Sequence, residues 1–259
     1  MATVGSVYSA LQADVQLGAA LAILVAALIR GFAGFGFALA AVPLLGFFLP
    51  PSHAVPLAVG LQLCGGLADL RYAHRSGHWP SLKWLIAGAM IGSPIGVLVL
   101  AIASPAAARL AIALACMVGT LALARGFNFP RVPSGHHSGW VGFAAGLFNG
   151  LAAMPGPPVV AYYLAMPLTV AQIRASLLIF FLACSLTSAA SLVIAGMIHF
   201  DMLPSILIGL PLMLLGSWAG EQLFKRSSAS RHRAISLFLL ATIAVMSGLQ
   251  ALSGFVAFR

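Results

Sequence analysis

Long apolar runs, separated by short polar links, make up most of the chain. A helix needs about 20 apolar residues to cross a bilayer. Runs close to that length cover residues 53–73, 81–102, 106–124, 169–197, 203–223 and 233–255. Only 7% of the residues are charged, whereas soluble domains carry about 25%. Because helices satisfy their own backbone groups in lipid, the sequence predicts an all-α polytopic membrane protein.

The charge balance is strongly basic, because 13 lysines and arginines stand against only four acidic residues. A net charge of +9 could indicate nucleic-acid binding, but the basic residues lie mainly in the links between apolar runs. Membrane proteins set their orientation by such links, so no nucleic-acid partner is expected. The three cysteines lie within apolar runs and are expected to be buried thiols, with no metal site and no cofactor.

The sequence contains an internal repeat. PSLKWLIAGAMIGSPIG at 80–96 matches PSILIGLPLMLLGSWAG at 204–220, with Pro-Ser at the start and Gly-Ser-x-x-Gly at the end of both. Upstream, RGFAGFGF at 30–37 matches NGLAAMPG at 149–156. Small changes in loop length separate the blocks, since the offset drifts between 124 and 119. A repeat of this kind predicts two structural halves.

Each half has the same order of parts. Two short apolar runs come first and three longer runs follow; the short runs are 17–29 and 37–49, and then 139–149 and 156–166. Directly after them, LPPSHA at 49–54 matches MPLTVA at 166–171 with an offset of 117. The predicted domains are a first membrane repeat at 1–125, a cytoplasmic link at 126–137 and a second membrane repeat at 138–259.

The basic residues favour one arrangement of the short runs. If the two short runs form a re-entrant hairpin, each half has three transmembrane helices and the halves are inverted. One face then holds only Arg109 and Arg259, and the other holds Arg71, Arg75, Lys83, Arg125, Arg131, Arg174, Lys225, Arg226, Arg231 and Arg233. If the runs cross once as a broken helix, the same residues divide equally. The positive-inside rule favours the hairpin with both termini periplasmic, and two thin full crossings give the same parity.

Both hairpins contain residues that interrupt helices. The first break is predicted at Gly31–Gly36, and the second in NGLAAMPGPP, whose prolines suit a helix start. Matching interruptions in two halves indicate a transporter binding site. The half-helix after each break presents unpaired N–H groups and partial positive charge, which bind anions. Arg30 adds a charged planar fork, and Asn149 supplies an amide at the matching position.

Structural interpretations remain open beside these functional ones. Gly31 and Gly34 also suit close helix packing, and Arg30 could cap carbonyl groups or extend to the membrane interface. Gln62, near the middle of its run, is a candidate for facing the substrate. Arg174 lies one to two turns into its run and either guides anions or anchors the helix at lipid phosphates. Hydroxyl groups expected to bond between helices are those of Ser176, Thr187 and Ser188.

The blocks RGFAGFGFALAAVPLL, GLFNGLAAMPGPPVVAYYLAMPL and RASLLIFFLACS resemble the sulfite exporter TauE/SafE family, and the likeness covers nearly the whole chain. The resemblance implies a bacterial inner-membrane transporter that exports small sulfur-containing anions, such as sulfite or an organosulfonate like sulfoacetate. The second break departs from the usual glycine-rich form by carrying MPGPP at 154–158. The predicted substrate-binding residues are Arg30, Gly34, Phe35, Gly36, Phe37, Gln62, Asn149, Met154, Pro155, Gly156 and Arg174.

Two other functions are alternatives to export. An anion channel or permease for import could use the same site, because the sequence does not show the gradients that set the direction of flux. A membrane enzyme is disfavoured, since the sequence has no metal-ligand spacing, no helix with paired carboxylates and no nucleophile with an evident base. The predicted partners are a small anion and the lipid bilayer, and a bundle of this size is compatible with a homodimer.

Overall fold

The computed structural model describes residues 2–33, 37–104, 135–198 and 202–225, together with positions 107, 108, 110, 111, 114 and 133. Regular structure in these ranges is helical, as the sequence predicts. The helices are α1 (Ala2–Ala33), α2 (Phe37–Leu45), α3 (Pro51–Ala73), α4 (Trp79–Ile102), α6 (Gly135–Ala152), α7 (Gly156–Leu164), α8 (Val170–Ile194) and α9 (Leu203–Lys225). The runs predicted at 106–124 and 233–255, and most of the link at 126–137, lie outside the described residues.

The outer surface of the bundle is apolar. Ile194 is 87% exposed and Ile102 is 78% exposed, and large aliphatic side chains continue along α4, α8 and α9. Such a surface is suited to lipid rather than water. By length and composition, four described segments can cross a membrane: Val15–Phe32, Trp79–Ile102, Gln172–Ile194 and Leu203–Leu223. These features agree with a polytopic membrane protein.

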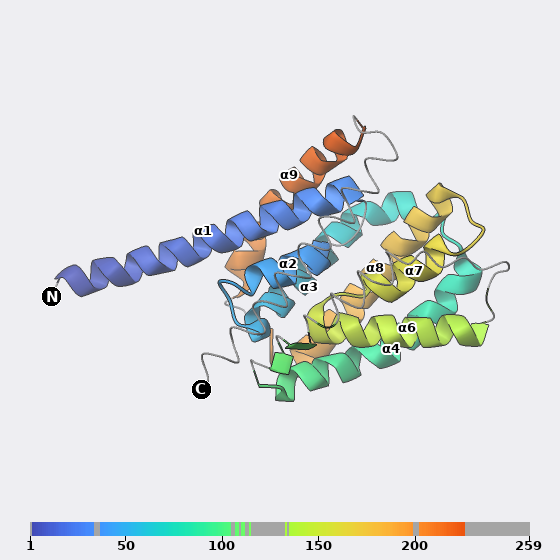
Figure 1. Ribbon diagram of the computed structural model, residues 1–259, viewed down its shortest axis with the longest axis horizontal. Coiled ribbons are helices and arrows are strands. Elements are labelled where there is room, and N and C mark those ends of the chain that lie inside the picture. Colours follow the sequence, from blue (N-terminus) through green and yellow to red (C-terminus); the bar gives the residue numbers. More distant parts are fainter. Residues whose placement is uncertain are drawn as a thin grey trace.

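The short runs of each half form helices of unequal length. The run expected at 17–29 forms the second part of α1, which already begins at Ala2. The first proline of the chain is Pro43, so no proline interrupts the helix before residue 17. α6 has 18 residues, whereas α2 and α7 have nine each. Nine helical residues extend about 14 Å, roughly half of the bilayer core. α2 folds back along α1, and α7 folds back along α6 (Figure 1).

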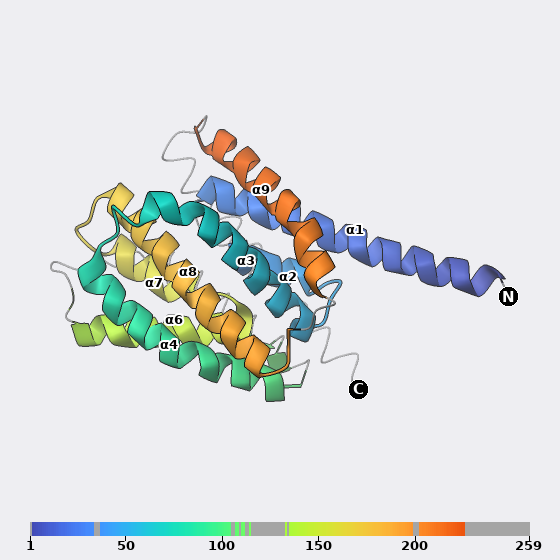
Figure 2. The same ribbon diagram turned by 180° about the vertical axis from the view of Figure 1, so that it is seen from behind.

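The two halves are joined by helix pairs that combine one helix from each half. α1 of the first half packs along α9 of the second, and α6 of the second half packs along α4 of the first. The two pairs lie on opposite sides of the bundle, with α3 and α8 between them (Figures 1 and 2). α3 and α8 contact each other and run in opposite directions.

Glycines allow the backbones of both helix pairs to approach closely. They recur at every fourth position on each side of the α4–α6 contact: Gly88, Gly92 and Gly96 on α4, and Gly142, Gly146 and Gly150 on α6. A Cβ at any of these positions would meet the backbone of the other helix. In the α1–α9 pair the same role falls to Gly31, Gly216 and Gly220. Small residues of this kind let helices pack in lipid, where no hydrophobic force drives them together.

Matched residues of the repeat make matched contacts in these pairs. A Cβ on Gly31 would strike the carbonyl oxygen of Ser217, and one on Gly150 would strike that of Ser93. Gly31 and Gly150 occupy equivalent places in the repeat, as do Ser93 and Ser217. The repeat in the sequence is therefore also a repeat of helix contacts in space.

Gly146→Ala should destabilise the protein, because its Cβ would meet backbone atoms of Ala89, and overpacking costs about 1–3 kcal/mol. Gly139→Ala on the same helix is the matched control, since nothing lies within 4 Å of a Cβ there. Alanine at this open helical position gains about 0.5–1 kcal/mol over glycine. Thermal unfolding in detergent should place Gly146→Ala below the wild type and Gly139→Ala at or above it. Equal midpoints for the two variants would contradict the packing.

Candidate functional site

The first break lies later in the chain than its sequence predicts. α1 continues through Gly31 to Ala33, and α2 starts at Phe37, so the prediction that the break begins at Gly31 was wrong. Gly31 is part of the helix because it packs against the backbone of Ser217, which is the packing role left open above. Phe37 is 2% exposed, and α2 is buried along most of its length. The described residues do not include Gly34, Phe35 and Gly36.

The second break is a tight turn at residues 153–155. Ala153 has a φ of 55°, a left-handed conformation that costs an L-residue about 1–2 kcal/mol. Its N–H donates to the carbonyl of Asn149 at 2.7 Å, and the N–H of Met154 donates to that of Phe148 at 3.3 Å. Carbonyl groups at the end of α6 are thereby satisfied. Pro155 directly precedes α7, and two further prolines lie in the first turn, as the sequence predicts for a helix start.

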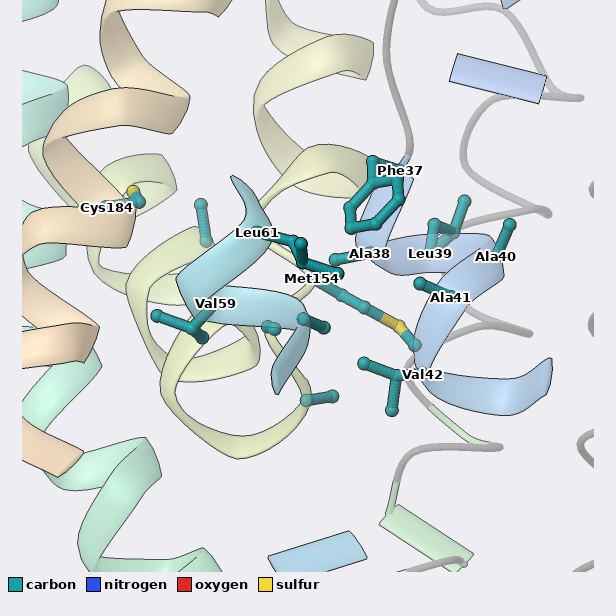
Figure 3. Packing of buried hydrophobic residues seen from close by; sticks show 14 of the residues in the cluster. Phe37, Ala38, Leu39, Ala40, Ala41, Val42, Val59, Leu61, Met154 and Cys184 are labelled. Atoms are coloured by element: carbon teal, nitrogen blue, oxygen red, sulfur yellow. The ribbon is translucent and has the colours of Figure 1, made fainter. Parts of the chain in front are cut away.

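The second break meets the beginning of α2. Met154 is 1% exposed and belongs to the same buried cluster as Phe37, Ala38 and Leu61. Its side chain extends from the break toward Val42 of α2, with Leu61 of α3 alongside (Figure 3). The end of the second interruption and the start of the half-helix in the first half therefore come together against α3.

Polar contacts connect α3 with α8, which also reaches the first turn of α7. Gln62 is half-buried, and its Nε2 donates to Ser185 Oγ of α8 at 3.0 Å. The Ser185 hydroxyl donates to the carbonyl of Phe181 at 2.8 Å. The ring of Phe181 is the only neighbour within 4 Å of a Cβ built on Gly156 in the described part of the chain, at 3.9 Å. Gly156 is buried, and among the described residues a Cβ there would make only this one ordinary contact.

Arg30 lies in the last turn of α1 and is half-buried. Its Nη1 donates to Ser217 Oγ of α9 at 3.2 Å and lies next to Gly65 of α3. The partial negative charge at the C-terminus of α1 favours a cation in this place. Arg30 therefore stands where α1, α3 and α9 meet, and Gly65 is about one helical turn beyond Gln62 on α3.

Asn149 is fully buried, and its amide group is engaged by other helices. Nδ2 donates to the Cys184 carbonyl at 2.8 Å and lies 2.6 Å from Ser188 Oγ and 3.3 Å from Ser93 Oγ. An amide nitrogen carries two hydrogens, so these neighbours leave no spare N–H. Oδ1 is buried and has no hydrogen-bond partner among the described residues. Asn149 and Arg30 match in the repeat but lie in separate helix pairs, α4–α6 and α1–α9.

Arg174 is exposed near the start of α8. A capping box between Thr169 and Gln172 begins this helix. Ser185, the partner of Gln62, lies eleven residues further along α8, a distance of about 16 Å along the axis. Arg174 is therefore remote from Gln62, and its role as anion guide or lipid anchor stays a prediction.

The model of the sulfite exporter TauE/SafE family matches the chain over residues 19–247. This protein belongs to the sulfite exporter TauE/SafE family. The match covers both breaks and both Gly-Ser-x-x-Gly blocks, and it confirms the resemblance drawn from the sequence. Comparison with curated proteins and with solved structures finds no match. As a member of a transporter family with apolar helices, the chain is a membrane transporter.

The hydroxyls of Ser93 and Ser217 are the site feature that the sequence analysis missed in this TauE/SafE protein. Ser217 and Ser93 come from equivalent Gly-Ser-x-x-Gly blocks and contact Arg30 and Asn149, which are also equivalent. The sequence does contain a signal for these two serines. Each Gly-Ser-x-x-Gly block places one polar residue at the same position of a glycine-rich helix. Bonds between helices were correctly predicted for Ser176 and Ser188, whereas the hydroxyl of Thr187 donates to the carbonyl of Ala183 in its own helix.

Ala153→Gly should stabilise this TauE/SafE protein by up to about 1 kcal/mol, because glycine adopts a φ of 55° without steric cost. Ala152→Gly is the matched control, since Ala152 is the last residue of α6 and lies in ordinary helix. It should destabilise the protein by about 0.5–1 kcal/mol. Chemical or thermal unfolding should give opposite signs for the two variants. Similar losses of stability in both would show that Ala153 is unstrained.

Proposed function

We propose that this protein is a secondary transporter that exports a small sulfur-containing anion, either sulfite or an organosulfonate such as sulfoacetate. The proposal is carried by the meeting of the second break with the start of α2 in a chain of the sulfite exporter family. The substrate binds between the N-termini of α2 and α7, near the bilayer midplane. The proposed location is the bacterial inner membrane, and assembly as a homodimer stays a prediction.

Electrostatics favours an anion at this place. Among the first four residues of α7, only Gly156 and Val159 carry an N–H, because the other two are prolines. The N–H of Val159 pairs with the carbonyl of Pro155 in the first helical turn, so the N–H of Gly156 and the helix dipole present the partial positive charge at this end of α7. Gln62 offers an amide, and Arg30 supplies a full charge from the last turn of α1. In apolar surroundings each of these interactions is stronger than in water.

The outward direction follows from the membrane potential. A bacterial cell interior is negative, so each negative charge that leaves gains about 2.3 kcal/mol per 100 mV. For a dianion the gain doubles, which is enough to drive export without a cation partner. The same site would serve an import permease if the anion gradient were reversed, so the direction is tested by the flux measurement below.

The proposed architecture is an inverted two-fold repeat with both termini periplasmic. Three features support it: α3 and α8 are equivalent in the repeat, contact each other and run in opposite directions (Figure 2). The mixed pairs α1–α9 and α4–α6 fit a two-fold axis that passes between α3 and α8. The excess of basic residues on the side of the predicted link assigns that side to the cytoplasm.

Pro50 and Pro167 test this topology, because they are matched by the repeat and both exposed. In an inverted repeat Pro50→Cys should react with a membrane-impermeant thiol reagent from the periplasm and Pro167→Cys only from the cytoplasm. Ser76→Cys, in the exposed link after α3, should behave like Pro167→Cys. The background is a variant without Cys64, Cys116 and Cys184. Labelling of both proline positions from one side would exclude the inverted arrangement.

Arg30→Ala should weaken sulfite binding about 10–100-fold, because a hydrogen bond to a charged group contributes about 1.5–3 kcal/mol. Arg30→Lys keeps the charge but loses the fork, so it should weaken binding less. Ser217→Ala is the matched control, since it removes the hydroxyl to which Arg30 donates and leaves the guanidinium in place. Affinity is measured as thermal stabilisation by sulfite, sulfoacetate, sulfate and acetate.

Flux measurements then test the function itself. Proteoliposomes loaded with radiolabelled sulfite should release it faster when the side corresponding to the cytoplasm is made negative. Arg30→Ala should reduce that release to the extent that it reduces binding. An Arg30→Ala protein that is less stable but binds and transports like the wild type would assign Arg30 to the capping of α1 instead. Wild-type protein that moves neither sulfite nor sulfoacetate would refute the proposed function.

A further inference from the structure

Two neighbouring tyrosines hold the end of α7 that lies away from the break. Tyr162 and Tyr163 are almost completely buried, and their rings pack edge to face with centroids 5.3 Å apart. The hydroxyl of Tyr162 forms a hydrogen bond with Ser138 Oγ of α6 at 2.7 Å. The hydroxyl of Tyr163 forms one with Ser81 Oγ of α4 at 3.0 Å. α7 is therefore tied to two other helices.

The bond of Tyr163 continues into the link between α3 and α4. Ser81 Oγ donates to the carbonyl of His78 at 3.1 Å and lies 2.9 Å from its Nδ1. The N–H of His78 in turn donates to Ser176 Oγ of α8 at 2.8 Å. Directional bonds thus join four helices, and the group that makes them, called the hydroxyl cluster below, consists of His78, Ser81, Ser138, Tyr162, Tyr163 and Ser176.

The equivalent half-helix α2 lacks the groups that such bonds require. Its sequence, FALAAVPLL, has no polar side chain, and Pro43 also lacks an N–H. The repeat matches Ser138 with Ala19 and Ser176 with Val59. Ser205 is the residue equivalent to Ser81, and it is exposed. The two half-helices are therefore alike in length and burial but held by different interactions.

We propose that Tyr162 and Tyr163 are positioning residues that fix α7, so that α2 is the half-helix that moves when the site opens to either side of the membrane. Buried hydrogen bonds depend on direction and distance, and breaking one leaves polar groups unsatisfied. Apolar contacts have no preferred direction and allow packed helices to slide. The motion of α2 rests on the proposed transport function, whereas the fixing of α7 does not.

Hydrogen–deuterium exchange of the full chain in lipid nanodiscs compares the two half-helices directly. In the wild type, the amides of α2 should exchange faster than those of α7. Tyr162→Phe and Tyr163→Phe each remove one hydroxyl and keep the ring, so each should raise exchange in α7 about fivefold and leave α2 unchanged. Exchange in α7 as fast as in α2, or unaltered in both variants, would overturn the proposal.

Equivalent serines provide a control that does not alter a tyrosine. Ser81→Ala removes the partner of Tyr163 and should raise exchange in α7, whereas Ser205→Ala should leave it at the wild-type rate. If both serine variants raised exchange in α7 equally, the effect would be a general loss of stability, and the specific role of the hydroxyl cluster would be refuted.

Transport kinetics separate positioning from a purely structural role. In proteoliposomes with radiolabelled sulfite, Tyr163→Phe should raise KM severalfold and keep the maximal rate, because the N-terminus of α7 is less well placed while α2 still moves. A lower maximal rate at unchanged KM would mean that α7 itself moves, which contradicts the proposal. If the wild type transports no sulfite or sulfoacetate, the proposed function fails, and the exchange experiment still decides whether the hydroxyl cluster fixes α7.

Discussion

A helix that breaks inside a bilayer leaves carbonyl groups at one end and N–H groups at the next start without water to satisfy them. The turn at residues 153–155 meets this constraint within the backbone. Ala153 takes a left-handed conformation, and its N–H and that of Met154 return to carbonyls of α6. Two prolines in the first turn of α7 remove donors that would otherwise be unpaired. The N–H of Gly156 is then the one donor in this turn without a carbonyl in α7 to pair with, and it is a donor available to the proposed anion.

The glycine-lined helix pairs supply the frame in which such a turn can persist. Each of the helices that lead into a break, α1 and α6, packs backbone to backbone on a helix of the other half. The helix that leads into each break is therefore held in place by a helix of the other half. α3 and α8 fill the space between the pairs, and their contact brings Gln62 of one half onto Ser185 of the other.

Residues within a segment were enough to predict the half-helices, but not which other helices pack against them. Prolines act on their own backbone, so the start of α7 could be predicted from its sequence. Gly31 could not be interpreted in this way, since glycine permits both a break and a close contact, and the contact with Ser217 decides between them. The repeat matched Asn149 with Arg30, but the separation of the two follows from how α1 and α6 pair with other helices. The partners of Asn149 on α8 likewise depend on the register between helices.

The two halves of the repeated sequence differ in chemistry at equivalent positions. An arginine at bilayer depth costs about 2.5–3.5 kcal/mol, and the dipole at the end of α1 offsets at most about 2 kcal/mol of this. The hydrogen bond to Ser217 offsets part of the insertion cost that remains, and a bound anion would offset more of it. In the other half a neutral amide, Asn149, is held by three neighbours, and the adjoining half-helix carries the tyrosine hydroxyls. The half that carries the charge thus has a half-helix without polar side chains, and the half that carries the neutral amide has a half-helix bonded through hydroxyl groups. In the proposed mechanism the charge that binds the anion and the bonds that fix a half-helix therefore come from different halves of a repeated sequence.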